Sequence, residues 1–140
     1  LSLKKLFSAQ GNNILFFKED LQFAKNIGKN IDILNSNNEI NKLQEKLNKK
    51  GIKLILLICP DKYDVYYNYF IDKIKYPKPT FFDVYNKLSK KYIYIKSKEL
   101  ISQLAKNQKD VYYFDDTHWS PIAAKRIAKE INETINSTER

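Results

Sequence analysis

The residues with the clearest chemical potential lie close together near the end of the chain. His118 and Trp119 are the only histidine and the only tryptophan, and Asp116 precedes the histidine by two positions. In an extended segment, residues two apart project to the same side. The carboxylate can then hydrogen-bond one imidazole nitrogen and leave the other nitrogen basic. This is the acid–base half of a nucleophile–His–Asp triad, so we predict catalytic roles for Asp116 and His118.

The same stretch also has less specific interpretations. An isolated Asp-x-His is common on protein surfaces, and Asp115 fits a simple turn cap. Trp119 fits a packing anchor beneath the loop better than a platform for substrate. A metal site is disfavoured because ligands beside the one histidine would have to be carboxylates. Cys59 is the only cysteine, which excludes a disulfide within the chain and a zinc site built on cysteine pairs.

The elements that must position these residues alternate along the chain. Apolar runs predict strands at residues 14–17, 52–59, 92–95 and 111–114. Caps and helical stripes predict helices from Ser36 to Gly51, after Asp61, after Thr80, from Ser97 and from Ser120. The helix after Asp61 is expected to bury Tyr63, Tyr66, Tyr67, Phe70 and Ile74. The last helix is expected to bury Ala124, Ile127, Ala128, Ile131 and Ile135. Residues 18–36 are expected to form a loop with isolated helical turns.

Strands that alternate with helices predict an α/β fold with three layers, a mostly parallel sheet and flanking helices. The run at residues 52–59 is apolar on both faces, which is typical of a central parallel strand. In open α/β sheets, sites form beyond the carboxyl ends of the strands. Residues 60–62 and 115–119 both follow predicted strands there. We therefore expect one domain over residues 1–140, with its site at this edge.

Charge and composition limit the partners. The formal net charge is +9, yet Arg126 and Arg140 are the only arginines beside many lysines, asparagines and isoleucines. Nucleic-acid sites depend on arginine, so this composition disfavours a nucleic-acid partner. Anionic polysaccharides and lipid head groups remain physically reasonable partners. No apolar run reaches the roughly 18 residues of a membrane span.

A longer pattern around these residues resembles a known family. The string YYFDDTHWSPIAA, with GIKLILLICPDKYDVYYNYF upstream and GNNILFF near the start, is similar to the AlgX/AlgJ family of alginate O-acetyltransferases, which have SGNH-hydrolase-like domains. The resemblance runs from about Gly11 to Ile131. It implies that Asp116 and His118 are the triad acid and base. Trp119 and Lys62 also match positions of the family pattern, and we expect both to contact substrate.

One part of the family pattern is missing from the sequence. The resemblance implies a nucleophilic serine on a Gly-x-Ser turn after the Asp-x-His pair. No glycine precedes a serine by two positions: the glycines are Gly11, Gly28 and Gly51. Ser120 is expected to cap the last helix, and the other candidates lie on predicted helices or at their starts: Ser89, Ser97 and Ser102. We therefore expect the nucleophile to lie beyond Arg140, the domain to be truncated on its C-terminal side, and the chain alone to be inactive.

The resemblance implies a function for the whole protein. A polysaccharide O-acetyltransferase would pass acetyl groups to sugar hydroxyls through a Ser-His-Asp triad, with no cofactor. Its partners would be a polysaccharide acceptor and an acetyl donor, which a membrane acetyl-transfer protein could supply. The expected location is the periplasm or cell envelope, with membrane anchoring through a segment before Leu1. Two alternatives stay open: a non-catalytic glycan-binding module, and a carbohydrate acetylesterase that uses water as acceptor.

Overall fold

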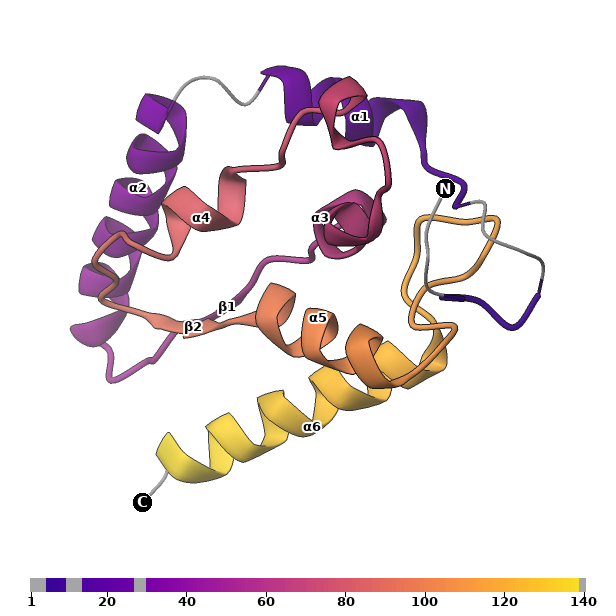
Figure 1. Cartoon of the computed structure of the whole chain (residues 1–140). Coiled ribbons are helices and arrows are strands. Elements are labelled where there is room, and N and C mark those ends of the chain that lie inside the picture. The colour runs from indigo at the N-terminus through magenta and orange to yellow at the C-terminus, as the bar shows by residue number, and fades with distance from the viewer. Residues whose placement is uncertain (1–4, 10–13, 27–29, 139–140) are drawn as a thin grey trace.

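The computed structural model describes residues 5–9, 14–26 and 30–138 and combines helices with a small parallel sheet (Figure 1). The elements in chain order are α1 (Lys18–Asn26), α2 (Asn30–Asn48), β1 (Ile55–Leu57), α3 (Lys62–Tyr66), α4 (Phe81–Tyr85), β2 (Ile93–Ile95), α5 (Ser97–Asn107) and α6 (Pro121–Thr138). Two 3-10 turns, η1 (Tyr67–Tyr69) and η2 (Lys73–Lys75), lie between α3 and α4.

The two strands pair in parallel, with Ile55 opposite Ile93 and Leu57 opposite Ile95. The α/β class and the parallel pairing are therefore as predicted. The strands at residues 52–59 and 92–95 are also where we expected them, although each is shorter. Because the described residues contain only these two strands, the predicted three-layer arrangement is not established.

The side chains around β1 alternate between two hydrophobic clusters, as the period of two residues requires. Leu54, Leu56 and Ile58 pack against one cluster, to which α2 contributes Ile33 and α4 contributes Tyr85. Leu57 packs against the larger cluster, which contains buried side chains of α5 and α6: Ile101, Ala105, Ala123 and Ile127. Helices α5 and α6 lie against each other, with α6 below α5 in Figure 1.

Helix α2 is joined to both strand regions by buried amide side chains. Asn37 donates to the carbonyl of Ser89 at 3.0 Å and accepts from the hydroxyl of Tyr92 at 2.7 Å. Gln44 donates to the carbonyl of Ile52 at 3.0 Å and accepts from the backbone N–H of Leu54 at 2.7 Å. Gln44 thus hydrogen-bonds the backbone just before β1, where the Leu54 carbonyl accepts from the N–H of Ile93 in β2.

The N-terminal third differs from the sequence prediction. Residues 14–17 do not form a strand, although their side chains alternate as in one: Ile14 and Phe16 pack against the core, whereas Leu15 and Phe17 are exposed. The predicted strand is therefore wrong, because among the described residues no neighbouring segment pairs with this one. Most of residues 18–36, predicted as loop, lie in α1 and α2. Ser36 therefore lies inside α2 and does not cap it.

Two predicted helical stripes are corrected in part. Tyr63, Tyr66 and Phe70 are buried, but Ile74 is 98% exposed because α3 ends at Tyr66 and the helical period does not continue. In α6, which begins after Ser120 as predicted, Ile127 is buried and Ile131 packs against the large cluster as expected, whereas Ile135 is exposed. Its buried residues are Ala123 and Ile127, whereas Ala124 and Ala128 are exposed.

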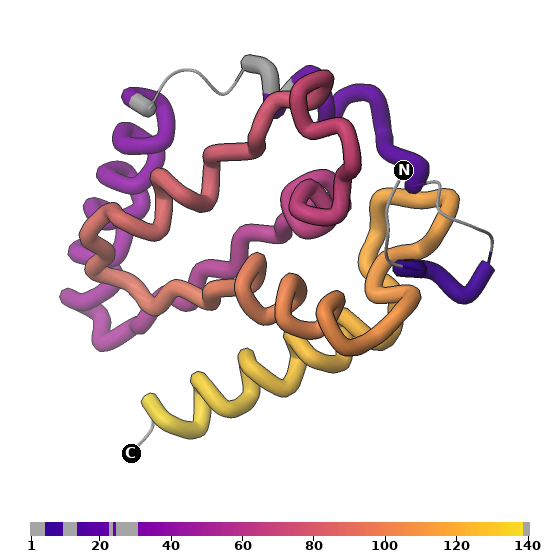
Figure 2. Tube along the Cα trace, in the orientation of Figure 1, coloured from indigo at the N-terminus to yellow at the C-terminus, as the bar shows by residue number. Residues whose placement is uncertain are grey.

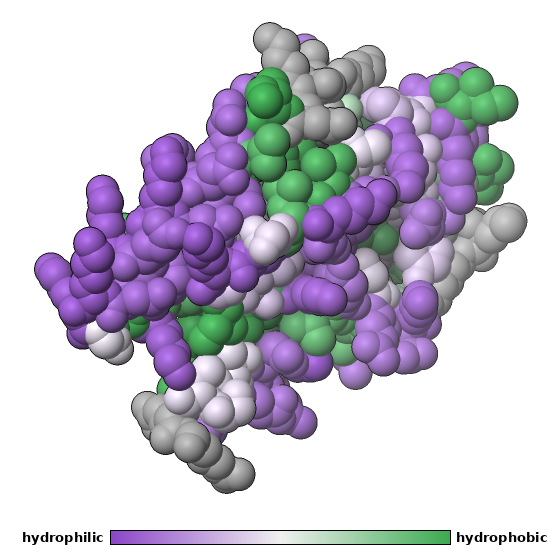
Figure 3. Space-filling model, turned by 90° about the vertical axis from the view of Figure 1, so that its left-hand side faces the viewer, coloured by the Kyte–Doolittle hydropathy of each residue, from purple (hydrophilic) through white to green (hydrophobic). Residues whose placement is uncertain are grey.

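The side of the molecule on which α2 lies is largely hydrophilic, with hydrophobic side chains showing between the polar ones (Figure 3). The exposed apolar residues of α2 are Ile31, Leu34 and Leu43. Across the described ranges, no helix combines the length and the apolar character needed to cross a membrane.

Candidate active site

The chain reverses direction in residues 111–120 and forms a short hairpin, which we call the His118 hairpin. Tyr112 and Trp119 form an antiparallel bridge. The N–H of Ser120 donates to the carbonyl of Val111 at 3.0 Å, and the N–H of Tyr113 donates to the carbonyl of His118 at 3.2 Å. Residues 111–114 were predicted to form a strand of the parallel sheet, and this prediction is wrong. Val111 and Tyr112 enter the core, but the backbone of this run pairs with the following residues of the same chain.

The base of the hairpin is fixed by the N-terminal segment, which lies beside it (Figure 2). The N–H of Asp110 donates to the carbonyl of Leu6 at 3.0 Å, and the carboxylate of Asp110 accepts from the N–H of Ser8 at 2.7 Å. Asp110 has φ of 56°, a left-handed conformation that aspartate tolerates better than most residues. These contacts set the direction in which the chain enters the hairpin.

At the tip of the hairpin, Asp116 and His118 are in contact. One carboxylate oxygen, Oδ1, lies 2.5 Å from the imidazole Nδ1 and also accepts the backbone N–H of His118 at 3.0 Å. The predicted contact is present, but the backbone at these residues is bent and not extended as predicted. A carboxylate that bonds the N–H two residues onward is typical of an Asx turn. The catalytic role of the pair stays a prediction.

The hydrogen bonds favour one protonation arrangement. Donation from the His118 ring, and then from its backbone N–H, lowers the pKa of the Asp116 carboxyl. An ionised carboxylate accepts only, so Nδ1 carries the proton that it receives. In the neutral imidazole, Nε2 is then the nitrogen that can accept a proton. The His118 side chain is 79% exposed, so this nitrogen is open to a reacting group.

A His118→Ala substitution is expected to raise the pKa of Asp116 toward its ordinary value. The imidazole donor is lost, while the backbone N–H of residue 118 remains, so the rise is partial. An NMR titration of the carboxyl carbon of Asp116 measures it. Thr117→Ala, which alters the neighbouring side chain and leaves both donors, serves as the control. An unchanged Asp116 pKa in His118→Ala would show that the contact does not persist in solution.

Beneath the tip, the carbonyl of Pro60 holds the two arms of the hairpin. It accepts from the Tyr112 hydroxyl at 2.7 Å and from Trp119 Nε1 at 3.2 Å, and Nε1 also donates to the Tyr112 oxygen at 3.1 Å. Tyr112 is fully buried, and Trp119 packs against the large hydrophobic cluster. The position of Trp119 therefore agrees with the packing anchor that the sequence favoured over a substrate platform.

Lys62 supports the hairpin from inside the protein. Lys62 is only 1% exposed, and its ammonium donates to the carbonyls of Phe114 at 2.9 Å and Leu15 at 3.0 Å. Burial lowers its pKa to about 8, against the opposing effect of the negative charges of Asp116 and Asp115. Lys62 was predicted to contact substrate, but its ammonium is buried and is not available for such a contact. The structure instead places Lys62 as a link between two segments.

No serine hydroxyl within the described ranges hydrogen-bonds His118. Ser97 donates to the carbonyl of Ile58 instead. Ser120 is 5% exposed, and its hydroxyl has no hydrogen-bond partner, so the cap predicted for α6 is not formed by this side chain. We therefore still expect the nucleophile of a complete triad to come from residues other than those that the structure describes.

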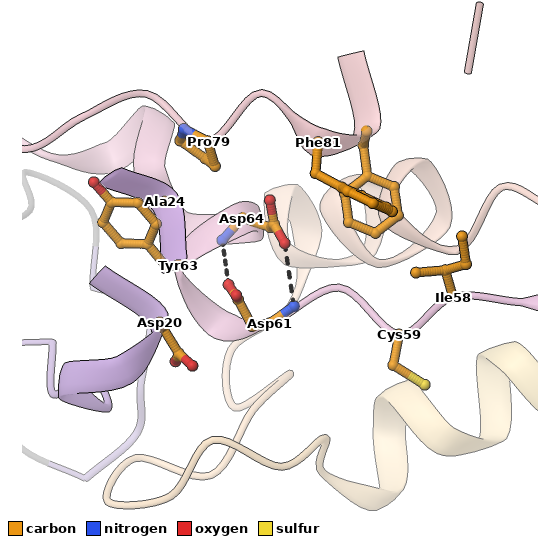
Figure 4. A pocket seen from close by; sticks show the side chains of 10 residues that line it. Asp20, Ala24, Ile58, Cys59, Asp61, Tyr63, Asp64, Pro79 and Phe81 are labelled. Atoms are coloured by element: carbon orange, nitrogen blue, oxygen red, sulfur yellow. Dashed lines mark hydrogen bonds between the residues drawn. The ribbon is translucent and has the colours of Figure 1, made fainter. Parts of the chain in front are cut away.

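Apart from the His118 hairpin, a pocket lies beyond the carboxyl end of β1 (Figure 4). It is a pocket of about 170 Å³ whose lining includes Cys59, Asp20, Asp61 and Asp64. Asp61 and Asp64 form the capping box of α3, with Asp64 N–H donating to Asp61 Oδ1 at 2.7 Å. Burial, then the charge of Asp61, raises the pKa of Asp64 to about 7 and that of Asp20 to about 6.

Sequence reasoning missed Asp20 and Asp64. The spacing Asp61-x-x-Asp64 is a recognisable capping signal, but nothing in the sequence links Asp20 to it. In the part of the chain that is described, no group of three or more His, Cys, Asp or Glu side chains could hold a metal ion.

Comparison with known proteins identifies the family of the chain. The family model for the SGNH hydrolase-like domain of acetyltransferase AlgX matches residues 11–140, so the chain belongs to this family. The chain is also 29% identical over 104 residues to the probable alginate O-acetylase AlgJ of Pseudomonas aeruginosa. That similarity covers 69% of this chain and 25% of the relative, so the chain spans about a quarter of that protein's length. No solved structure matches.

Proposed function

We propose that this chain supplies the acid–base part of an O-acetyltransferase that acts on polysaccharide hydroxyls. The observation that carries the proposal is the hydrogen bond of 2.5 Å between Asp116 Oδ1 and His118 Nδ1, in a chain of the AlgX family. Asp116 fixes the ring and its tautomer, and His118 Nε2 is the general base. These are the roles of the acid and the histidine in a triad.

The first half-reaction requires a serine from a part of the protein outside residues 1–140. His118 Nε2 accepts the proton of the serine hydroxyl as the serine oxygen attacks the acetyl carbonyl of the donor. The donor's leaving group departs with the proton returned by the imidazolium, and an acetyl-serine remains. Asp116 stabilises the positive charge on the imidazolium during this step.

In the second half-reaction a sugar hydroxyl attacks the acetyl-serine. Nε2 accepts the proton of that hydroxyl, the acetyl group passes to the sugar oxygen, and the serine oxygen regains a proton from the imidazolium. The same histidine thus acts twice, and the acceptor must approach the exposed side of the ring. If water takes the place of the sugar, the protein is an acetylesterase.

The wider setting is part of the proposal. Family membership supports a polysaccharide acceptor and an acetyl donor, and the resemblance favours a periplasmic or cell-envelope location. We expect the serine-bearing part of the protein to add strands beside β1 and β2 and so to complete the three-layer fold. The scarcity of arginine argues against a nucleic-acid acceptor.

The test uses the full-length protein with 4-nitrophenyl acetate as donor and oligosaccharides as acceptors, with mass spectrometry of the acetylated sugar. His118→Ala is expected to reduce acetyl transfer by a factor of about 100 to 10,000, the usual contribution of general acid–base catalysis. Asp115→Asn, a neighbouring exposed carboxylate, is the matched control and should retain activity. Unchanged transfer in His118→Ala would refute the role of this histidine. Acetate release without sugar acetylation would favour the esterase, and sugar binding without turnover would favour the glycan-binding module.

A further inference from the structure

The register of the His118 hairpin places a second side chain on the same face as His118. Tyr112 and Trp119 are directly opposed. Moving one residue along each arm makes Tyr113 the partner of His118, and the N–H of Tyr113 donates to the His118 carbonyl at 3.2 Å. Directly opposed residues of an antiparallel pair project from the same face, with Cβ atoms about 4.5–5.5 Å apart. Tyr113 is therefore the cross-strand neighbour of His118.

The two faces of the hairpin have different surroundings. The inner face carries Tyr112, fully buried, and Trp119, and both side chains hydrogen-bond the Pro60 carbonyl. Tyr113 and His118 alternate with them and belong to the outer face. Their exposure agrees with this, since Tyr113 is 46% exposed and the His118 side chain is 79% exposed.

An exposed aromatic ring beside a general base is suited to hold a sugar. A pyranose ring has an apolar face of C–H groups and a rim of hydroxyls, and a tyrosine ring offers a rigid apolar surface with a polar end. Phe17 and Tyr76 are also exposed, but neither belongs to the His118 hairpin. Tyr113 is the exposed ring of the hairpin itself.

We propose that Tyr113 is the platform on which a pyranose ring of the acceptor polysaccharide stacks, with a ring hydroxyl directed toward His118 Nε2. This inference rests on the proposed function, because it assigns the acceptor to the exposed face of the catalytic histidine. Tyr113 contacts the acceptor and takes no part in attack on the acetyl donor. Its effect is therefore on the affinity for sugar and not on formation of the acetyl-enzyme.

The first experiment measures sugar binding by this chain with three tetrasaccharide probes: tetramannuronate, cellotetraose and chitotetraose. NMR titration at millimolar sugar follows the ring signals of Tyr113. Tyr113→Ala is expected to weaken binding about tenfold, and Tyr113→Phe, which keeps the ring, about twofold or less. Tyr76→Ala, a ring 40% exposed elsewhere on the surface, should leave the affinity unchanged. Failure of all three probes to shift the Tyr113 signals would overturn the platform, as would equal affinity of Tyr113→Ala and the unmodified chain.

A second measurement separates this inference from the proposed function. In the full-length protein, Tyr113→Ala is expected to raise the KM for the acceptor sugar about tenfold. Tyr76→Ala, outside the hairpin, should leave both this KM and the rate of acetate release to water unchanged. His118→Ala should abolish turnover and retain sugar binding. If His118→Ala abolishes turnover while Tyr113→Ala has a normal KM, the platform is wrong and the catalytic role stands. If sugar binding depends on Tyr113 but His118→Ala remains active, the catalytic role is wrong and the platform stands.

Discussion

Replacing Tyr112 with alanine is expected to lower the free energy of unfolding by about 3–5 kcal/mol, the usual cost of deleting a buried aromatic ring. Tyr112 is fully buried, packs edge-on against Tyr66 with ring centroids 5.6 Å apart, and bonds the Pro60 carbonyl. Alanine would leave a cavity at the base of the His118 hairpin. Urea unfolding followed by circular dichroism measures the loss. The fluorescence of Trp119, the only tryptophan, reports on the hairpin itself.

Two matched variants make this prediction specific. Tyr112→Phe keeps the ring and removes the hydroxyl, so we expect a cost of about 1–2 kcal/mol for its hydrogen bonds with the Pro60 carbonyl and Trp119 Nε1. Trp119 Nε1 retains the Pro60 carbonyl as its acceptor in that variant. Tyr113→Ala changes the neighbouring, exposed tyrosine and should alter stability little. If Tyr112→Ala were no more destabilising than Tyr113→Ala, the hairpin would not be packed into the core as described.

Replacing Lys62 with methionine is expected to lower the free energy of unfolding by about 2 kcal/mol, because two backbone carbonyls lose a charged donor. Methionine retains most of the apolar stem, so the packing of the side chain changes little. Lys42→Met, which removes a surface ion pair with Glu39, is the control and should leave stability unchanged. A stability of Lys62→Met equal to that of the unmodified chain would mean that Lys62 does not link residues 15 and 114.

The pH dependence of the stability of the same variant gives a second test. The pKa of Lys62 is about 8 in the folded protein, below the ordinary value of 10.5. Between these values the unfolded chain binds more protons at this group than the folded chain does, so the contribution of Lys62 to stability rises with pH. It is lowest below pH 8 and complete above 10.5. The difference in stability between the unmodified chain and Lys62→Met should therefore grow over this interval. A constant difference would contradict the burial of the ammonium.

The parts of the fold that the sequence predicts are those with strong local signals. Asp61 is the N-cap of α3, as its position after Pro60 indicates. The apolar runs at residues 52–59 and 92–95 contain β1 and β2. Asp116 and His118 are two positions apart, so their contact needs only a local bend. Each of these features depends on residues close in sequence, which is why a pattern can reveal it.

The remaining features depend on pairings that the composition of a segment does not encode. Residues 14–17 and 111–114 have the composition of strands, but whether such a run joins a sheet depends on a neighbour that the run itself does not encode. Lys62 has the appearance of a surface residue until the carbonyls of residues 15 and 114 are brought to it. The role that we propose for Tyr113 depends on the register of the hairpin, which becomes known only when the pairing of Tyr112 with Trp119 is seen.

The peptide unit of Pro60 has a consequence for how far the sheet can extend. Proline has no N–H, and its carbonyl already accepts from Tyr112 and Trp119. Ile93 N–H donates to the Leu54 carbonyl, so the even-numbered residues of this segment face β2. A continuation of the pairing with β2 would find no backbone donor at position 60 and an acceptor already engaged. The residue that binds the His118 hairpin thus also limits the length of the parallel pair of β1 and β2.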